Sequence, residues 1–395
     1  MTNGSSPFAT LPQFVPRPSR PVDSPFGRDQ ATLIVQGVNY QDWESVWVQL
    51  RWQEPYDHFR FTAVERDTPP GMFYKLQFVP GEDCKINLGG IDVIDGFIET
   101  RQVAYDATKH GVELQGVSST AWSSKSSVND QTGSFDGMSF SAVARKVLAP
   151  YPVGVIEIGE LDETPFDKLQ AQKGEMIWDF LERLARPRGV VLSSDSFGNY
   201  LLIGNHHAPI VNTQLIEGEN IKKMQFMMYK RHVYVAYRVD AQTAGGSNGV
   251  MGTQASELTA TVGGGTGKLN SLLITPAEQP VKSYDEVLRR AKNEFIWHEG
   301  PQIEASVTVQ GWFRDEYNIW WPGENVFLYS PMCPSNMVMK IKATTFSQDS
   351  ANGTETVLDL VQPWALMDIG PMNVGDPIAT NPTPETIAPG QPIAD

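Results

Sequence analysis

One glycine-rich run in the sequence could bind a nucleotide phosphate. The run GGGTGK occupies positions 263–268, whereas a phosphate-binding loop reads Gly, four residues, Gly-Lys and then Ser or Thr. Val262 stands just before the run, and Leu269 occupies the place where such a loop needs a hydroxyl. No apolar strand is expected to lead into it, so the run predicts a loop and not a nucleotide site.

The six histidines do not form a metal-binding pattern. None belongs to H-E-x-x-H or to an i, i+4 pair on a helix, the spacings that bring two imidazoles to one metal ion. His206 and His207 adjoin at the end of a predicted strand, so their side chains should point apart. We expect no metal and no cofactor. The histidines are His58, His110, His206, His207, His232 and His298.

Pairs of carboxylates could perform general acid–base chemistry. A glycoside hydrolase needs two Asp or Glu residues that flank the scissile bond. With 46 acidic residues the chain offers such pairs by chance, and it has no G-x-S-x-G nucleophile elbow. We expect no catalytic residue, with a peptidoglycan hydrolase as the enzymatic alternative. Examples of the pairs are Glu157 with Glu160 and Asp162 with Glu163.

Two tryptophans and two cysteines complete the chemically interesting residues. Trp320 and Trp321 could stack on a sugar, which leaves a carbohydrate-binding protein as a further alternative. An aromatic pair at the start of a strand is more often part of a core or an interface. Cys84 and Cys333 are far apart in sequence and lack metal-ligand spacing, so we expect two buried thiols without a disulfide.

The charge of the chain argues against a DNA-binding function. Its 395 residues carry a formal net charge of -15, spread along the chain, which repels phosphates and supplies no basic footprint. Such a surface suits a wall past which DNA slides without sticking. No apolar run approaches the ~20 residues that span a bilayer. The N-terminus lacks a basic and then apolar signal pattern, so export by that route is not expected.

Residues 30–119 predict a first β domain. Apolar and polar residues alternate at 45–52 and 58–65, as half-buried strands require. The alternating stretch 221–239 predicts a further strand, and we expect 205–240 to complete this domain. The stretch 93–119 predicts a hairpin whose charges line a channel, meet a neighbouring subunit or face solvent. Those charged residues are Glu99, Arg101, Asp106, Lys109 and Glu113.

The rest of the chain predicts an insertion, a second β domain and two Pro-rich ends. Residues 120–204 predict a small α/β domain with two helices and a hairpin. Residues 241–366 predict a second β domain that contains a flexible loop, 242–266, and a helix, 283–298, capped by Ser283. Residues 1–29 predict a Pro-rich N-terminal arm. Residues 367–395 predict a Pro-rich acidic C-terminal tail.

Four sequence blocks follow one another in a recognisable order. They are DGFIETRQVAYDATKHGVELQGVSS at 95–119, PFDKLQAQKGEMIWDFLERLARPRGVVLSSDSFGNYLLIG at 165–204, VLRRAKNEFIWHEGPQIEASVTVQGWF at 287–313, and the closing strands from LYSPM to PWAL at 328–366. In this order they resemble the baseplate hub proteins of contractile-tailed phages, the Mu-type hub or late-control-protein-D-like family. The resemblance covers about residues 30–366, and the first block ends in GVSS where the family has Gly-Arg-Ser.

The resemblance implies a mainly β fold, with two tail-tube-like β-barrel domains and a small α/β domain. It implies a structural protein and not an enzyme: a homotrimer whose pseudo-sixfold ring joins the hexameric tail tube to the trimeric central spike and lines the DNA channel. The implied partners are the tail tube or distal tail protein, the spike and the tape-measure protein, with DNA as a transient passenger. The implied location is the virion baseplate, after assembly in the host cytoplasm.

Overall fold

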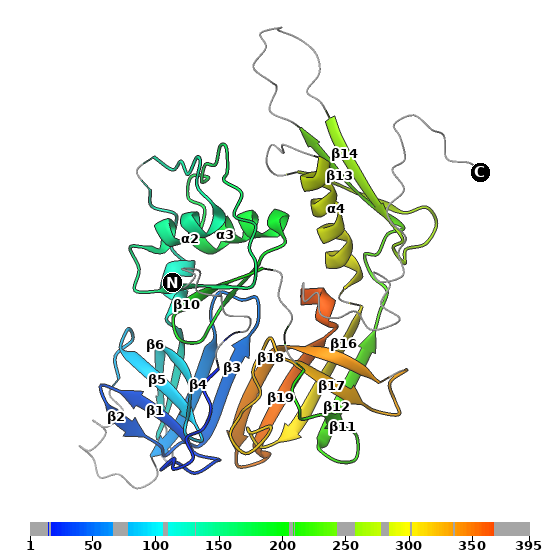
Figure 1. Cartoon of the computed structure of the whole chain (residues 1–395). Helices are drawn as coiled ribbons and strands as arrows, with labels where there is room; N and C mark the ends of the chain where they lie inside the picture. Colours follow the sequence, from blue (N-terminus) through cyan, green and yellow to red (C-terminus); the bar gives the residue numbers. More distant parts are fainter. Residues whose placement is uncertain are drawn as a thin grey trace, which may run out of the picture.

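Strands dominate the chain, and the elements fall into four units (Figure 1). Two β units lie side by side in the lower half of the view, and two smaller α/β units lie above them. The fold is therefore mainly β, which confirms the predicted fold class. The computed structural model describes residues 15, 17–65, 78–105, 110–130, 132–204, 208, 210–242, 257–277, 284–300, 302–334 and 336–366.

The first β unit is built from the strands that the alternating pattern predicts. In β3 (Ser45–Arg51), half-buried and buried residues alternate, so that Val46, Val48 and Leu50 reach the core. The other strands are β1 (Ala31–Val35), β2 (Val38–Tyr40), β4 (His58–Glu65), β5 (Asp83–Leu88), β6 (Ile91–Tyr105) and β7 (His110–Ser118), paired in the order β3-β4-β7-β6-β5-β1-β2.

The second β unit has its own core, which contains Leu215, Val307 and Leu358. We expected residues 205–240 to complete the first β domain, and this is wrong, because β11 and β12 pair with β17 and β16 of the second unit. Alternation predicts a strand but says nothing of its partner. The strands are β11 (Leu215–Ile216), β12 (Ile221–Met228), β16 (Ile303–Gln310), β17 (Asn325–Tyr329), β18 (Met337–Asp349) and β19 (Gly353–Val361).

A hydrogen-bonded seam between β3 and β18 joins the two β units into one sheet of 13 strands. The first part of β18 pairs with β17, and its second part, from Ala343 to Gln348, pairs antiparallel with β3. Phe346 on β18 lies opposite Val48 on β3, and both are buried in the core of the first unit. The second unit thus supplies part of the first unit's core.

The inserted α/β unit lies between the two β units in chain order. Its helices confirm the predicted ones, and the apolar stripe of Ile177, Leu181 and Leu184 is buried. The Ser139 side chain caps α2 by accepting a hydrogen bond from the Ala142 N–H. The elements are α1 (Thr120–Ser124), α2 (Phe140–Leu148), β8 (Gly154–Ile158), α3 (Ile177–Ala185), β9 (Val191–Ser194) and β10 (Asn199–Ile203), with the sheet order β8-β10-β9.

A second α/β unit stands where we expected a loop and part of the second β domain. The stretch 221–239 is not one strand, because β12 ends at Met228 and a new sheet starts at Ala236. Residues 257–263, inside the predicted flexible loop, form a strand whose alternating Leu258, Ala260 and Val262 pack under α4. Ser283 lies outside the described residues. The elements are β13 (Ala236–Gln242), β14 (Glu257–Gly263), β15 (Leu272–Pro276) and α4 (Tyr284–Glu299).

We predict that Phe346→Ala destabilises both β units together. The ring fills the first core from a strand of the second unit, and loss of a buried Phe costs roughly 3 to 5 kcal/mol. Amide hydrogen exchange, measured at low urea concentrations, should be faster in strands of both units of the variant than in the unchanged chain. Ser347→Ala, one residue along on the opposite face, should change little. Faster exchange confined to one unit would show that the seam does not couple them.

Candidate assembly interface

The glycine-rich run at 263–268 surrounds a buried carboxylate. Thr266 donates its backbone N–H to Glu299 Oε1 at 2.9 Å and its hydroxyl to Oε2 at 2.6 Å. Glu299 also accepts a hydrogen bond from the Tyr237 hydroxyl at 3.0 Å. A phosphate at this turn would meet a negative charge that already uses the donors. The run is therefore a structural turn that holds the end of α4.

Three of the four carboxylates considered for acid–base chemistry take part in structural contacts. Glu157 pairs with Arg145, and Glu163 accepts a hydrogen bond from the Ser141 hydroxyl at 2.8 Å. Asp162 pairs with Arg289 at 2.8 Å and with Arg188 at 3.7 Å. Burial disfavours the charged form of Asp162, but hydrogen bonds from Thr164 and the two arginines outweigh it and hold the pKa below its usual range. A general acid would need the opposite shift.

The adjacent tryptophans of the 311–324 loop are buried in different cores. Trp320 packs in the core of the second β unit, and Trp321 packs in the core of the first. Neither ring is open to a sugar, so the core interpretation is confirmed. The two side chains fasten one loop to both β units. Of the two free thiols, Cys84 is buried as expected, whereas Cys333 is only half-buried.

Two of the described histidines lie against aromatic rings, His58 against Tyr56 and His298 against Tyr237. His298 stacks on the Tyr237 ring and lies 3.6 Å from Glu294. Burial lowers the pKa of His58. His206 and His207 lie outside the described residues. The described residues contain no group of three or more His, Cys, Asp or Glu placed to hold a metal ion, and none of their helices is long and apolar enough to cross a membrane.

The charged residues of the 93–119 hairpin are only partly placed by the structure. Glu99 on β6 pairs with Lys125 at 3.1 Å, and Glu113 on β7 accepts a hydrogen bond from Gln115 at 2.6 Å. Arg101 lies in the C-terminal half of β6. Asp106 and Lys109 lie outside the described residues. Their suggested roles at a channel or a neighbouring subunit stay predictions.

The last part of the N-terminal arm clamps the 311–324 loop. Arg17 donates to the Pro322 carbonyl at 2.8 Å, and its guanidinium lies 5.1 Å from the Trp321 ring centre. The Arg20 backbone N–H donates to the Tyr317 carbonyl at 2.7 Å. Each of the two hydrogen bonds gives a loop carbonyl a donor from a segment about 300 residues earlier in the chain.

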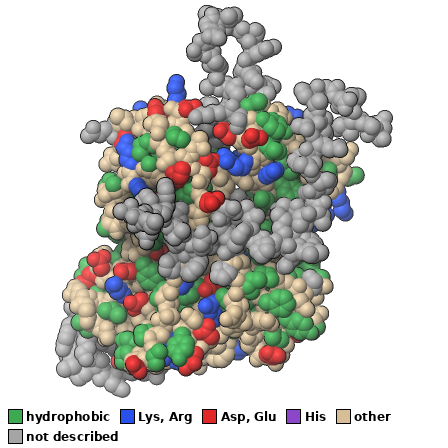
Figure 2. All heavy atoms as spheres, in the orientation of Figure 1, with side chains coloured by type: hydrophobic (Ala, Val, Ile, Leu, Met, Phe, Trp, Pro, Cys, Tyr) green, Lys and Arg blue, Asp and Glu red, His purple; other side chains and the backbone are tan. Residues whose placement is uncertain are grey.

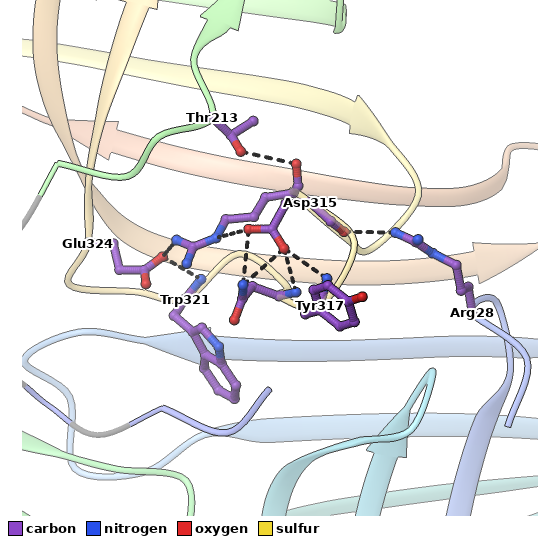
Figure 3. Close-up of polar contacts among 8 residues, drawn as sticks. Arg28, Thr213, Asp315, Tyr317, Trp321 and Glu324 are labelled. Atoms are coloured by element: carbon purple, nitrogen blue, oxygen red, sulfur yellow. Dashed lines mark hydrogen bonds and ion pairs between the residues drawn. The ribbon is translucent and has the colours of Figure 1, made fainter. Parts of the chain in front are cut away.

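Figure 3 shows how the same loop holds its own shape. Asp315 Oδ1 accepts the backbone N–H groups of Tyr317 and Asn318 at 2.9 and 2.8 Å. Arg314 donates to Glu324 at 2.6 Å, which closes the loop ends. Arg28 of the arm reaches the Asp315 carbonyl at 2.8 Å. The loop that carries both tryptophans is therefore braced from inside and from the arm.

A buried carboxyl group connects the first β unit to the inserted α/β unit. Asp57 Oδ1 accepts the Arg51 backbone N–H at 2.7 Å, and Oδ2 accepts the Ser196 hydroxyl at 2.8 Å. Burial raises the pKa of Asp57 to about 6, although these hydrogen bonds and the charges of Arg17 and Arg51 oppose the shift. Sequence reasoning missed this residue, because Ser196 approaches it from a distant part of the chain.

The two β units share one topology. The first unit reads β3-β4-β7-β6-β5-β1 and the second reads β12-β16-β19-β18-β17-β11, and corresponding strands also follow the same order along the chain. The four successive pairs from β3–β4 to β6–β5 are antiparallel, as are their counterparts from β12–β16 to β18–β17. The last pair differs, since β1–β5 is antiparallel and β11–β17 is parallel.

A β-bulge marks the same place in both units. The long strand β6 shifts register against β7 between Ile98 and Thr100. The corresponding strand β18 shifts register against β19 between Ile341 and Ala343. A bulge is a specific local feature that bends a strand, so its recurrence supports a structural repeat. Each chain thus carries two versions of one β unit.

Two family models match the first part of the chain. Residues 30–118 match the N-terminal domain of the Mu phage baseplate assembly protein GpP-like family, and residues 124–204 match the second domain of the baseplate hub protein gp44-like family. These residues are of the phage baseplate hub type. The resemblance read from the sequence is confirmed over the first β unit and the inserted α/β unit. No curated protein matches the chain.

Solved tail proteins share the fold of most of the chain. The 43 kDa tail protein of prophage MuSo2 from Shewanella oneidensis superposes with a TM-score of 0.72 at 24% identity, over 86% of this chain and 99% of that one. A tail protein of Neisseria meningitidis MC58 gives 0.71 at 18% identity, over 87% and 99%. An E. coli component of the type VI secretion system gives 0.51 at 11% identity, over 84% and 76%.

We predict that Asp57→Asn gains stability relative to the unchanged chain as the pH rises. A folded-state pKa of about 6 lies above the usual value, so the stability that protonated Asp57 contributes is present at low pH and is lost as the pH rises through about 6. Asn keeps the acceptor for Arg51 and carries no charge. The difference in unfolding free energy should shift towards Asn by on the order of 3 kcal/mol between pH 4 and 7.

Urea unfolding at four pH values measures this difference, and Asp136→Asn provides a control. Hydrogen bonds from Leu169 and Ser134 hold the pKa of Asp136 below its usual value, so its contribution to stability is already complete above that value, and the difference for that variant should stay nearly constant from pH 4 to 7. A constant difference for Asp57→Asn across this range would contradict the assignment.

Proposed function

We propose that the chain is the structural hub of a contractile-tail baseplate, and that three copies form a ring with pseudo-sixfold symmetry. The repeat of one β unit within each chain carries this proposal. Three copies present six similar units, which can match a hexameric tail tube on one side and a trimeric central spike on the other. The matches to baseplate hub domains and the fold shared with tail proteins support it.

The proposed ring lines the channel through which DNA leaves the virion. The net charge of -15 supports this role, because an acidic wall repels a passing phosphate backbone and prevents its capture. DNA is then a transient passenger. The proposal assigns no catalytic step to the chain, and its work is symmetry matching through large interfaces. It places the protein in the tail baseplate of the virion, after assembly in the host cytoplasm.

The proposed partners are the tail tube or distal tail protein, the central spike protein and the tape-measure protein. The E. coli protein that shares the fold is a type VI secretion component described as similar to the T4 tail proteins gp27 and gp5. Its likeness supports a place in a tail-like machine. The surface also supports contacts, since hydrophobic side chains gather over the lower right of the molecule, where Figure 1 places the second β unit (Figure 2).

We predict that the purified chain has a native mass three times the 43.8 kDa of one chain. Native mass spectrometry over a range of concentrations measures it, and labelling of the chain in assembled tails should place it at the tip of the tube. A stable single chain at every concentration that is also missing from the tail tip would contradict the proposal.

A further inference from the structure

The seam inside each chain is a template for a contact between chains. In that seam β3 of the first unit pairs with the part of β18 beyond its bulge. Because the two units share one topology, each has a counterpart of both partners. The counterpart of β3 in the second unit is β12, and the counterpart of β18 in the first unit is β6. The seam uses only one strand edge from each unit.

The ladders inside each unit fix which residues correspond. The bulges align Glu99 of β6 with Lys342 of β18, so Val103 corresponds to Phe346. The pairing of β4 with β7 places Phe59 opposite Gly116, and the pairing of β16 with β19 places Ala305 opposite Leu360. These two residue pairs correspond to each other.

The strands next to these give the last equivalence. Val48 lies opposite Phe59 in the first unit, and Phe226 lies opposite Ala305 in the second. Phe226 therefore corresponds to Val48, and Met224 to Val46, two steps along the same face. In the first unit, Val46 and Val48 are buried core residues, whereas Met224 and Phe226 are only partly buried against the second core.

The two remaining counterparts leave apolar side chains in solvent. Strand β5 accompanies β6 only as far as Phe97, and no other described strand than β7 runs beside β6 from Thr100 onwards. Val103 is 49% exposed there, although its counterpart Phe346 is fully buried by the seam. On β12, which pairs with β16 alone among the described strands, Met227 is 44% and Met228 57% exposed. Open apolar strand edges invite pairing with another chain.

We infer that β12 of one copy pairs antiparallel with the outer part of β6 of a second copy, in the register of the internal seam. Val103 then lies opposite Phe226, as Phe346 lies opposite Val48, and Gln102 lies opposite Met227, as Thr345 lies opposite Gln49. The inference rests on the proposed ring and names the surface that closes it. Backbone hydrogen bonds supply the pairing, and Val103 with Phe226 extends the apolar core across the contact.

The positions of the two edges suit a closed ring. The seam of β3 and β18 lies between the β units, with β6 on the far side of the first unit and β12 on the far side of the second (Figure 1). Each copy therefore offers one edge of each type at opposite ends, which gives a head-to-tail contact. Such contacts form a ring when the rotation closes and a filament when it does not. Lys222 and Lys223 on β12 are exposed charges that restrain pairing with unsuitable edges.

A disulfide tests the register directly. In a Cys333→Ser background, Gln102→Cys and Met227→Cys together place two thiols directly opposite each other, about 5 Å apart between Cα atoms, which a disulfide can bridge. Mild oxidation should give covalent dimers and trimers on a non-reducing gel. The matched control replaces Met227→Cys with Met228→Cys, whose side chain points to the opposite face of the same strand, and it should stay uncrosslinked.

Each outcome of the cross-linking decides one part of the account. Trimers of native mass that do not cross-link overturn the strand pairing and leave the proposed ring intact. Equal cross-linking of the control overturns the register. Covalent species that grow beyond three chains support the pairing and overturn the closed ring. A chain that remains single and uncrosslinked at every concentration overturns both.

A charge at the centre of the contact gives a second readout. Val103→Asp buries an unpaired carboxylate between β6 and β12 of the next copy, so the dissociation constant of the assembly should rise about 100-fold or more. Thermal unfolding of the isolated chain should change little, because Val103 is half exposed. Val38→Asp, at a 52% exposed position on β2 outside the pairing, is the matched control. Equal dissociation constants for the two variants would overturn the inference.

Discussion

The hydrogen-bonded pairing of β3 with β18 is the interaction on which the rest of the structure depends. It joins strands about 300 residues apart in the chain, as the hydrogen bond from Gln49 to Thr345 shows. Through it, Phe346 of the second β unit becomes part of the first unit's core, and Trp321 of the neighbouring loop joins the same core. The cost of closing so long a loop grows only slowly with its length, and the many contacts that the seam orders offset it.

The bulge in β18 lies where one strand passes from pairing within its own β unit to pairing with the other. Before the bulge, β18 pairs with β17 of its own unit, and after it the strand pairs with β3 of the other. The bulge bends the strand where it changes partner. The same device in β6 leaves β7 as that strand's one partner past Glu99 among the described strands. A repeat that is already satisfied inside the chain on one side and open on the other is the physical basis for a ring of several chains.

Local structure could be predicted from the sequence, and long-range pairing could not. The stripe of α3 and the alternation of β3 lie in short windows, and the structure confirms both. The break between β12 and β13 was missed, because the same period of two continues on both sides of it. The repeat was hidden because corresponding core positions differ in type, as Phe59 and Ala305 or Gly116 and Leu360 do. A large side chain at one position can be balanced by a small one at the position opposite, so the two units can fill the same space with different residue types.

For the site residues, too, local features could be predicted from the sequence and long-range contacts could not. The sequence was sufficient to predict that Trp320 and Trp321 belong to a core, but not that they enter two cores, because this depends on where the loop lies between the units. Asp57 gave no signal, since its environment is assembled by Ser196 and by the arm residue Arg17. Assembly surfaces, unlike catalytic motifs, have no fixed residue types, and they become visible only when strand edges are placed in space.

A density map of the assembled chain, at a resolution that separates neighbouring strands, tests the central claim most directly. The account predicts three copies and six β units around one channel, with a continuous sheet in which β3–β18 seams within chains alternate with β12–β6 seams between them. A closed assembly in which the copies meet through their α/β units, with β6 and β12 both facing solvent, would contradict it.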